Sequence, residues 1–499
     1  MDGRFAPLAL MACSLLPSII IFLLGREQTL LRNLVNLVGA GLKIALVVVM
    51  LWGVYLGREY SLELQLGGGL ELLLRIDTLA LLFVSLSAVL WFVTTVYAIS
   101  YLSKDSEQRR FFGFFSLCVA STVGIALAGN PLTFFFFYEI LTLSTLPLVV
   151  HRGDDKSIAS ARTYLRYTLA GSAVLLVGIL WLEALVGPAT FVQRPPEMTV
   201  LAVDQPVTLG IIFALMVAGL AVKGAMIPFH AWLPAAMVAP APVSALLHAV
   251  AVVKAGAFGI VRVVFDLYGI ELTASLGLGL PLTIAASVTI ILGSVMALQQ
   301  HEVKKRLAYS TVSQVSYIML GASLLSPVAL IGCLVHLVHQ GIMKITLFFC
   351  AGALEKTLGI HRIEELDGVG QRMPLTMLAF SAGALGMIGV PPLAGFISKW
   401  YLGVGSLNAE QGWVIAVLAG STLLNAAYFL PLLYRAWFLP PRKPWTELPT
   451  IARWEAPVWL ILPAVFTALA SLATGLLAAV PFSPLEWARL IIEREYALQ

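Results

Sequence analysis

The sequence predicts an all-α polytopic membrane protein with about fourteen transmembrane helices. Of its 499 residues, 59% are hydrophobic and only 12% are charged, and the mean hydropathy is +0.92. Soluble domains carry about twice that share of charged residues. Apolar runs of about 20 residues recur along the whole chain, which is the length that crosses a bilayer as a helix. Backbone polar groups inside lipid must be paired internally, so these runs are expected to be helical.

Fourteen segments have the length and composition of spans. The seventh and the twelfth are too long for one plain helix and contain prolines, so we expect both to be broken. Residues 58–75 alternate polar and apolar side chains, which predicts a short hairpin at the membrane surface. The expected spans are residues 5–24, 30–57, 77–100, 109–128, 131–150, 162–187, 206–237, 240–265, 272–297, 305–325, 327–353, 374–402, 411–438 and 455–482.

A coarse internal repeat divides the chain. A three-helix segment (1–108) precedes two five-helix blocks (109–265 and 266–440), and a C-terminal helix follows (441–499). The fourth helix of each block is the broken one, and Pro228 and Pro391 lie 163 residues apart. Because five is odd, the blocks enter the membrane from opposite sides. Inverted repeats with interrupted helices are typical of transporters.

The basic residues orient the chain. Nineteen of the 31 lie in or beside the loops after odd-numbered spans, and seven lie at the termini and in the other loops. The positive-inside rule then places the odd loops in the cytoplasm and both termini on the outer side of the cytoplasmic membrane. The first apolar run lacks a basic leader, so we expect it to remain as a span.

Several function classes are excluded. A net charge of +4, scattered over short loops, does not indicate a nucleic-acid partner. The isolated cysteines predict neither a zinc nor an iron–sulfur site, and no motif for another cofactor or metal is found. These cysteines are Cys13, Cys118, Cys333 and Cys350.

Ionisable residues at membrane depth are the strongest functional signal. A charge at the centre of a helix costs about 2.5–3.5 kcal/mol on insertion scales, so such groups are expected to face a hydrated interior and to carry function. The group comprises Glu139, His248, His336, His339 and the lysines Lys43, Lys223, Lys254, Lys344 and Lys399. Among them, Lys43 is the weakest candidate, because it could pair with a neighbour or extend to the interface. His339 could simply form a hydrogen bond between helices.

A proton path through these groups requires a switch and a relay. Burial lowers the pKa of a lysine in general, and a nearby carboxylate opposes this effect. A Glu–Lys pair of variable separation is therefore a switch, and we predict that Glu139 and Lys223 form it. On one helix, His248 and Lys254 would differ by about 9 Å in height. Water would bridge such gaps, held by polar residues such as Ser244, Ser313, Gln314 and Ser316.

Prolines supply the helix breaks. Pro228 donates no backbone hydrogen bond and obstructs the carbonyl one turn earlier. Freed carbonyls can then polarise water or a cation. The run GMIGVPPLAG, with Pro391 and Pro392, should break its helix more thoroughly. His230 follows the first break closely, whereas Glu183 lies near a span end and is expected to be interfacial.

Several motifs resemble the antiporter-like subunits of respiratory complex I and the large subunits of Mrp-type cation/proton antiporters. They are KGAMIPFHAWLP (223–234), APAPVSALLH (239–248), VKAG (253–256), KKRLAYSTVSQ (304–314), HLVHQGIMK (336–344) and GFISK (395–399). The resemblance extends from the fourth span to the thirteenth. It implies a fourteen-helix fold with two inverted repeats and a central hydrated axis.

The resemblance also assigns roles to residues. It makes Glu139 and Lys223 the glutamate–lysine pair, His248 with Lys254 a first relay, His336 with Lys344 a second relay, and Lys399 the exit residue. One complex I member has glutamate at the last position, so lysine argues against that member. The chain has no room for the long lateral helix of the most distal member. The remaining types are the Mrp-D type, the middle or proximal complex I type, and hydrogenase equivalents. The pattern leans to the Mrp-D-like or hydrogenase-like types.

Three functions remain open at this stage. The chain could be a proton-translocating subunit of a redox-driven complex, or a subunit of a sodium/proton antiporter. It could also be a non-conducting scaffold, or a module for uptake of another solute such as inorganic carbon. The first two imply other membrane subunits as partners and protons, with or without Na⁺, as the transported ions.

Overall fold

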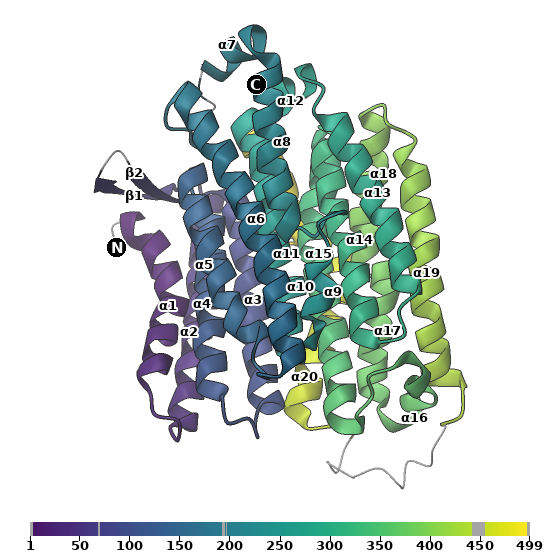
Figure 1. Cartoon of the computed structure of the whole chain (residues 1–499). Coiled ribbons are helices and arrows are strands. Elements are labelled where there is room, and N and C mark those ends of the chain that lie inside the picture. The colour runs from purple at the N-terminus through teal and green to yellow at the C-terminus, as the bar shows by residue number, and fades with distance from the viewer. Residues whose placement is uncertain (1–2, 68–69, 192–194, 196, 442–454, 497–499) are drawn as a thin grey trace.

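A computed structural model describes residues 3–67, 70–191, 195, 197–441 and 455–496 as an elongated helical bundle (Figure 1). Helices near the N-terminus form one edge of the bundle, and α19 forms the other. The N-terminal part contains η1 (Gly3–Phe5), α1 (Ala6–Leu23), α2 (Thr29–Tyr55), the strands β1 (Tyr60–Gly67) and β2 (Leu70–Ile76), and α3 (Thr78–Tyr101).

The helices that follow fall into two stretches. The first holds α4 (Gln108–Leu127), α5 (Pro131–Val149), α6 (Asp155–Val186), α7 (Glu197–Asp204), α8 (Pro206–Lys223), α9 (Trp232–Ala235), η2 (Ala236–Val238), α10 (Ala241–Ala249), α11 (Val252–Val261) and η3 (Arg262–Tyr268). The second holds α12 (Ile270–Ser275), α13 (Gly279–Leu298), α14 (Val303–Ser323), α15 (Pro327–Leu358), η4 (Ile363–Leu366), α16 (Val369–Arg372), α17 (Pro374–Ile388), α18 (Ala394–Asn408) and α19 (Val414–Phe438). The chain closes with α20 (Val458–Leu476), α21 (Pro484–Ile491) and η6 (Ile492–Tyr496).

The chain is a multi-pass membrane protein. Within the described residues, 12 helices are long and apolar enough to cross a membrane. Two of the expected spans are not among them. The tenth corresponds to α14, which begins with basic residues and carries many hydroxyl groups, and the twelfth is divided into α17 and α18, of 15 residues each.

The predicted hairpin is confirmed and is the exception to the all-helical fold. Strands β1 and β2 pair antiparallel, with Tyr60 opposite Ile76. Part of the basic-residue count falls on Arg194, Arg442, Lys443 and Arg453, which lie outside the described residues, as does part of the expected C-terminal segment 441–499.

Both predicted helix breaks are confirmed. Helix α8 ends at Lys223 and helical structure resumes at Trp232, so Pro228 lies in the interruption. Helix α17 ends at Ile388 and α18 begins at Ala394, with Pro391 and Pro392 between them.

A third break was not predicted. The expected eighth span is interrupted at Val250 and Ala251, between α10 and α11. The prediction that His248 and Lys254 share one continuous helix is therefore wrong. No proline or glycine marks this break, which explains why the sequence did not reveal it.

Helix α15 and the segment Ala241–Tyr268 form the core of the bundle. Within Ala241–Tyr268, every residue of the most apolar 18-residue stretch is buried. Helix α15 packs against α14, α17, α18, α20, α10 and α3. By contrast, α2, α6 and α19 expose large apolar side chains, as expected of helices that face lipid. In Figure 1 the α1–α2 connection lies at the lower end of the bundle, the chain begins at the opposite end of α1, and C marks the upper end.

The C-terminal segment docks at the upper end of α3 and η3. Arg262 forms ion pairs with Asp77 at 2.8 Å and with Asp266 at 2.7 Å. The Glu495 carboxylate accepts a hydrogen bond from the Thr78 backbone N–H at 2.9 Å. Burial, beside two other carboxylates, raises the pKa of Glu495 to about 8. The terminal contact is therefore sensitive to pH.

Candidate functional site

Lys223 is the last residue of α8, and its ammonium group turns toward α5. The Nζ atom donates a hydrogen bond to the Tyr138 carbonyl oxygen and lies 3.2 Å from the centroid of the Tyr138 ring. The side chain is fully buried. A lysine at this position is thus held by a backbone dipole and an aromatic face, both of which favour a cation.

Glu139 is the next residue along α5, and its carboxylate accepts a hydrogen bond from the Ser172 hydroxyl on α6. Among the described residues, Glu139 and Lys223 form no direct ion pair, although Lys223 lies within electrostatic range of the glutamate. The structure therefore brings the two groups close together without joining them.

Helix α11, which carries Lys254, packs against the end of α8 through Gly256. A Cβ atom at Gly256 would lie 2.3 Å from the Gly224 nitrogen, so the two backbones are in direct contact and only glycine fits. The Lys254 Nζ donates to the Leu337 carbonyl at 2.7 Å. His248, on the other side of the break, stacks near Phe348 with a centroid distance of 4.7 Å.

Helix α15 carries His336 and Lys344, which are expected to form a relay, and also the buried His339. The His336 Nε2 donates to the Gln314 carbonyl at 3.1 Å, and the Ser398 hydroxyl lies 2.8 Å from its Nδ1. The Lys344 Nζ donates to the Ser310 hydroxyl at 2.6 Å. His339 forms the interhelical hydrogen bond considered for it, from Nδ1 to the Ala394 carbonyl at 2.7 Å.

Lys399 is held by the second helix break. Its Nζ donates to the Ile388 carbonyl at 2.7 Å and to the Met387 carbonyl at 3.2 Å, both at the C-terminal end of α17. The Thr422 hydroxyl on α19 lies at 3.2 Å. The end of a helix leaves carbonyl groups without partners and carries partial negative charge, which suits a cation.

These groups follow one another through the bundle. His248 is within electrostatic range of Lys304 and Lys344, and Lys344 is in range of Lys254. Lys254 and Lys399 are in turn both in range of His336.

Buried polar atoms without a partner line the same region. Among the described residues they include both ring nitrogens of His248, both amide atoms of Gln314 and Gln340, and the Tyr317 hydroxyl. Such atoms normally bind water. Of the polar residues expected to hold water, only Gln314 has an uncommitted side chain, because Ser244, Ser313 and Ser316 bond to neighbouring protein oxygens.

The residues expected to be peripheral differ in their surroundings. Lys43 does not extend to the interface but is buried, with its Nζ 2.9 Å from the Ser14 hydroxyl and 4.5 Å from the Trp91 ring. It contacts α1 and α3, not the relay. Glu183 is half-buried near the end of α6. His230 lies in the first break, 6.1 Å from the Tyr309 ring.

Sequence reasoning missed the partners of the charged groups. Tyr138, Ser172, Ser310 and Thr422 hold the ammonium and carboxylate groups, but they are ordinary helix residues with no distinguishing spacing. Within the described residues, no three His, Cys, Asp or Glu side chains come together as a metal site.

Comparisons with known proteins identify the family. Residues 128–425 match the model described as "NADH:quinone oxidoreductase/Mrp antiporter, TM". The chain is 35% identical over 422 residues to NADH-quinone oxidoreductase subunit N of Desulforudis audaxviator, covering 82% of each protein. It is 31% identical to the A/B component of a probable K⁺/H⁺ antiporter of Rhizobium meliloti, covering 86% of this chain and 42% of that protein. Hydrogenase-4 component B of Escherichia coli is 31% identical, with 76% and 58% covered.

Solved structures have the same fold. A chain of the Mrp complex from Dietzia sp. superposes with a TM-score of 0.85 at 23% identity, covering 99% of this chain and 98% of that chain. A chain of an archaeal membrane-bound sulfane sulfur reductase superposes with a TM-score of 0.84 at 24% identity, covering 97% and 96%. This chain therefore belongs to the NADH:quinone oxidoreductase/Mrp antiporter family and is an antiporter-like membrane subunit.

Proposed function

We propose that this chain translocates protons through a path of buried lysines and histidines, water and the half-buried Glu139, as one subunit of a multi-subunit complex. The path begins at Glu139 and Lys223 and ends at Lys399. One observation carries the proposal, namely that Lys223, Lys254, His336 and Lys344 are all fully buried in the interior of the bundle. Each buried charge would be costly if it served structure alone.

The contact between α5 and Lys223 supports a switch. The ammonium now binds the Tyr138 carbonyl, and the carboxylate of the adjacent residue, Glu139, binds Ser172. A small movement of the lysine side chain would exchange one partner for the other. With the carboxylate close, the lysine keeps its proton, and with the carboxylate withdrawn, it passes the proton on.

The finer topology belongs to the same proposal. Counting α14 and the pair α17–α18 as spans, in addition to the 12 long apolar helices, gives fourteen. Breaks after Lys223 and after Ile388 occupy equivalent places in two five-helix blocks, which supports the inverted repeat. The positive-inside rule then places the lower end of Figure 1 in the cytoplasm and both termini outside.

The relatives support two sources of energy. One is named as a quinone oxidoreductase subunit, and another as a cation/proton antiporter subunit. We propose that partner subunits couple proton movement either to redox chemistry or to exchange for a cation such as Na⁺. Moving one charge against 100 mV requires about 2.3 kcal/mol, which the partners must supply.

The test measures proton flux by the complete complex in vesicles. Glu139→Gln and Lys223→Met should each reduce driven proton flux to the background of empty vesicles while the complex still assembles. Matched controls are Glu183→Gln and Lys43→Met, which remove the same charges outside the path. Both controls should retain flux.

The outcome distinguishes a conduit from a scaffold. Wild-type flux in both Glu139→Gln and Lys223→Met would overturn the proposal and favour a non-conducting role. Replacing Na⁺ by choline in the same vesicles separates the two kinds of coupling, since only an antiporter loses flux.

A further inference from the structure

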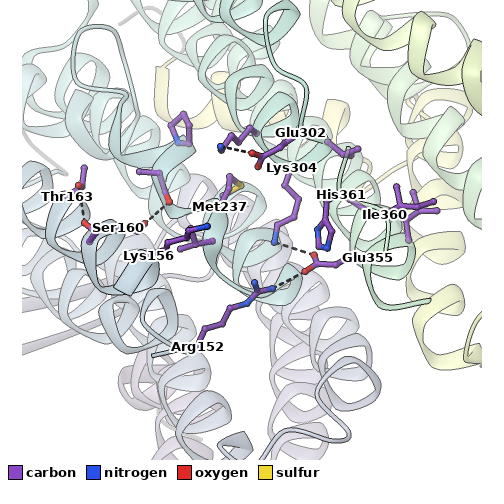
Figure 2. A pocket seen from close by; sticks show the side chains of 18 residues that line it. Arg152, Lys156, Ser160, Thr163, Met237, Glu302, Lys304, Glu355, Ile360 and His361 are labelled. Atoms are coloured by element: carbon purple, nitrogen blue, oxygen red, sulfur yellow. Dashed lines mark hydrogen bonds and ion pairs between the residues drawn. The ribbon is translucent and has the colours of Figure 1, made fainter. Parts of the chain in front are cut away.

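A cavity of about 700 Å³ lies at the lower end of the bundle, between α6, the α9–η2 segment, α14 and the end of α15. Figure 2 shows Lys156, Ser160 and Thr163 on one side and Lys304, Glu355 and His361 on the other. The proton path above does not use its α6 wall.

The charged side chains that line this cavity favour an anion. Four are basic, namely Arg152, Lys156, Lys304 and Lys305, and two are acidic, namely Glu302 and Glu355. The acidic groups are already engaged. Glu355 binds Arg152 at 2.9 Å and Lys304 at 3.5 Å, and Glu302 binds Lys305 at 2.8 Å.

Lys156 remains available. Among the described residues it forms no hydrogen bond or ion pair, although Asp154 lies within electrostatic range. The Asp154 carboxylate is itself occupied, because it caps α6 by accepting the Ser157 N–H at 2.7 Å. A ligand with one or two negative charges would therefore complete the cavity.

A second hollow lies farther along the same helix and shares no lining residue with the first. It has a volume of about 320 Å³ and is lined almost entirely by apolar atoms of α6, α8 and the first helix break. On α6, the charged cavity uses Lys156, Ser160 and Thr163, and the apolar groove uses Tyr167, Ala170 and Val174. A spacing of three or four residues keeps these six on one face of a helix.

The combined length fits one leaflet of a bilayer. From Lys156 to Val174 the helix rises by about 27 Å, and from Ser160 to Val174 it rises by about 21 Å. Half of a bilayer, headgroup region included, is about 20–22 Å thick. A charged cavity at the rim and an apolar groove toward the midplane therefore match the two parts of a single lipid.

We propose that this face of α6 binds one anionic glycerophospholipid, with its phosphate bound by Lys156 in the charged cavity and one acyl chain in the groove. The end of the acyl chain would contact Val222 and Phe229, which border the helix break after Lys223. The bound lipid would thereby stabilise the first helix break through contacts on its outer surface. This binding does not depend on the proposed proton path.

The experiment uses the purified full-length chain, stripped of lipid in mild detergent. Phosphatidylglycerol or phosphatidylcholine is added back, and bound lipid is counted by native mass spectrometry. One phosphatidylglycerol should be retained in preference to phosphatidylcholine. Lys156→Gln should weaken its binding about fivefold, which corresponds to about 1 kcal/mol for one lysine near an anionic lipid.

One further variant tests the groove, and two matched controls, one for the charge and one for the groove, accompany the tests. Arg162→Gln removes a charge about 120° around α6 from Lys156 and should bind normally. Ala170→Trp fills the groove and should abolish retention, whereas Ala184→Trp, about 21 Å farther along α6, should not. Thermal stability, measured in detergent for each variant, confirms that the variants are folded.

Three results would overturn the proposal. The first is equal retention of phosphatidylglycerol by Lys156→Gln and Arg162→Gln. The second is competition by inorganic phosphate together with normal binding in Ala170→Trp, which would indicate a site for a free anion. The third is loss of a copurifying subunit instead of lipid in Ala170→Trp, which would indicate a protein interface.

Discussion

Gly395 is the point at which the two halves of the broken helix α17–α18 touch. A Cβ atom at this position would lie 1.9 Å from the Gly386 carbonyl oxygen and 2.9 Å from its carbon. Both are backbone atoms, so neither can rotate away. Gly395→Ala would force the two half-helices apart by about 1.5 Å before the contact reached the 3.4 Å of ordinary packing.

This displacement has two measurable consequences. Overpacking costs about 1–3 kcal/mol, and the usual helix gain of about 0.5–1 kcal/mol for Gly→Ala offsets part of it. We expect a net loss of about 1–2 kcal/mol. The same movement would stretch the 2.7 Å bond from Lys399 to the Ile388 carbonyl beyond hydrogen-bond range, so proton flux should fall as well.

Gly403→Ala is the matched control, on the same helix α18. The nearest atom to its Cβ would be the Leu418 Cδ1 at 4.0 Å, so only the helix gain remains. The assay is the thermal transition of the purified chain in lipid nanodiscs, followed by flux in vesicles. Equal or greater stability in Gly395→Ala than in Gly403→Ala would refute the reasoning.

Three further predictions follow. Ser310→Ala removes the hydroxyl that lies 2.6 Å from the Lys344 Nζ and should lower proton flux in vesicles without affecting assembly. The matched control is Ser313→Ala, which removes a hydroxyl bonded to Ser294 and should leave the flux unchanged. Equal flux in the two variants would contradict the proposed relay. Lys43→Met should retain near-normal flux in the same assay while it lowers the thermal transition, because only its contacts with α1 and α3 are lost. The pKa of Glu495 is raised from 4.5 to about 8 in the folded chain, so its contribution is full below pH 4.5 and is lost as the pH rises through 8. Compared with Glu495→Gln at the same pH, the wild-type chain should therefore be cleaved by trypsin after Arg494 more readily at pH 9 than at pH 6.

Hydropathy and proline placement were sufficient for much of the fold. The hairpin, the two proline breaks and most helix positions follow from side-chain pattern, because lipid forces backbone pairing within each segment. The break between α10 and α11 could not be predicted, since Val250 and Ala251 are common inside helices. Beyond the break, α11 packs closely against the end of α8 at Gly256 and Gly224, a tertiary contact that no local sequence pattern reveals.

The candidate site was predicted in composition but not in contacts. The cost of burying a charge selected Lys223, Lys254, Lys344 and Lys399 together with Lys43, and the structure buries the first three fully and Lys399 in part. Sequence reasoning expected a carboxylate beside Lys223. The nearest group is instead a backbone carbonyl, which no residue pattern reveals, because every residue carries one.

The buried lysines bond to carbonyl oxygens, and this has a consequence for the proposed proton path. Among the described residues, the ammonium groups of Lys223, Lys254 and Lys399 bind carbonyl oxygens and not carboxylates. A buried lysine paired with a carboxylate is held firmly in its charged form, since breaking such a pair costs about 3–5 kcal/mol. A carbonyl dipole stabilises the cation less, so the proton can leave when a neighbouring charge changes. Glu139 is then the natural control point, because it is the one carboxylate of the predicted set and lies beside the first of these lysines. Moving that single charge toward or away from Lys223 would change how readily this lysine releases its proton. Because neighbouring cations repel one another, the change would also affect the other buried lysines.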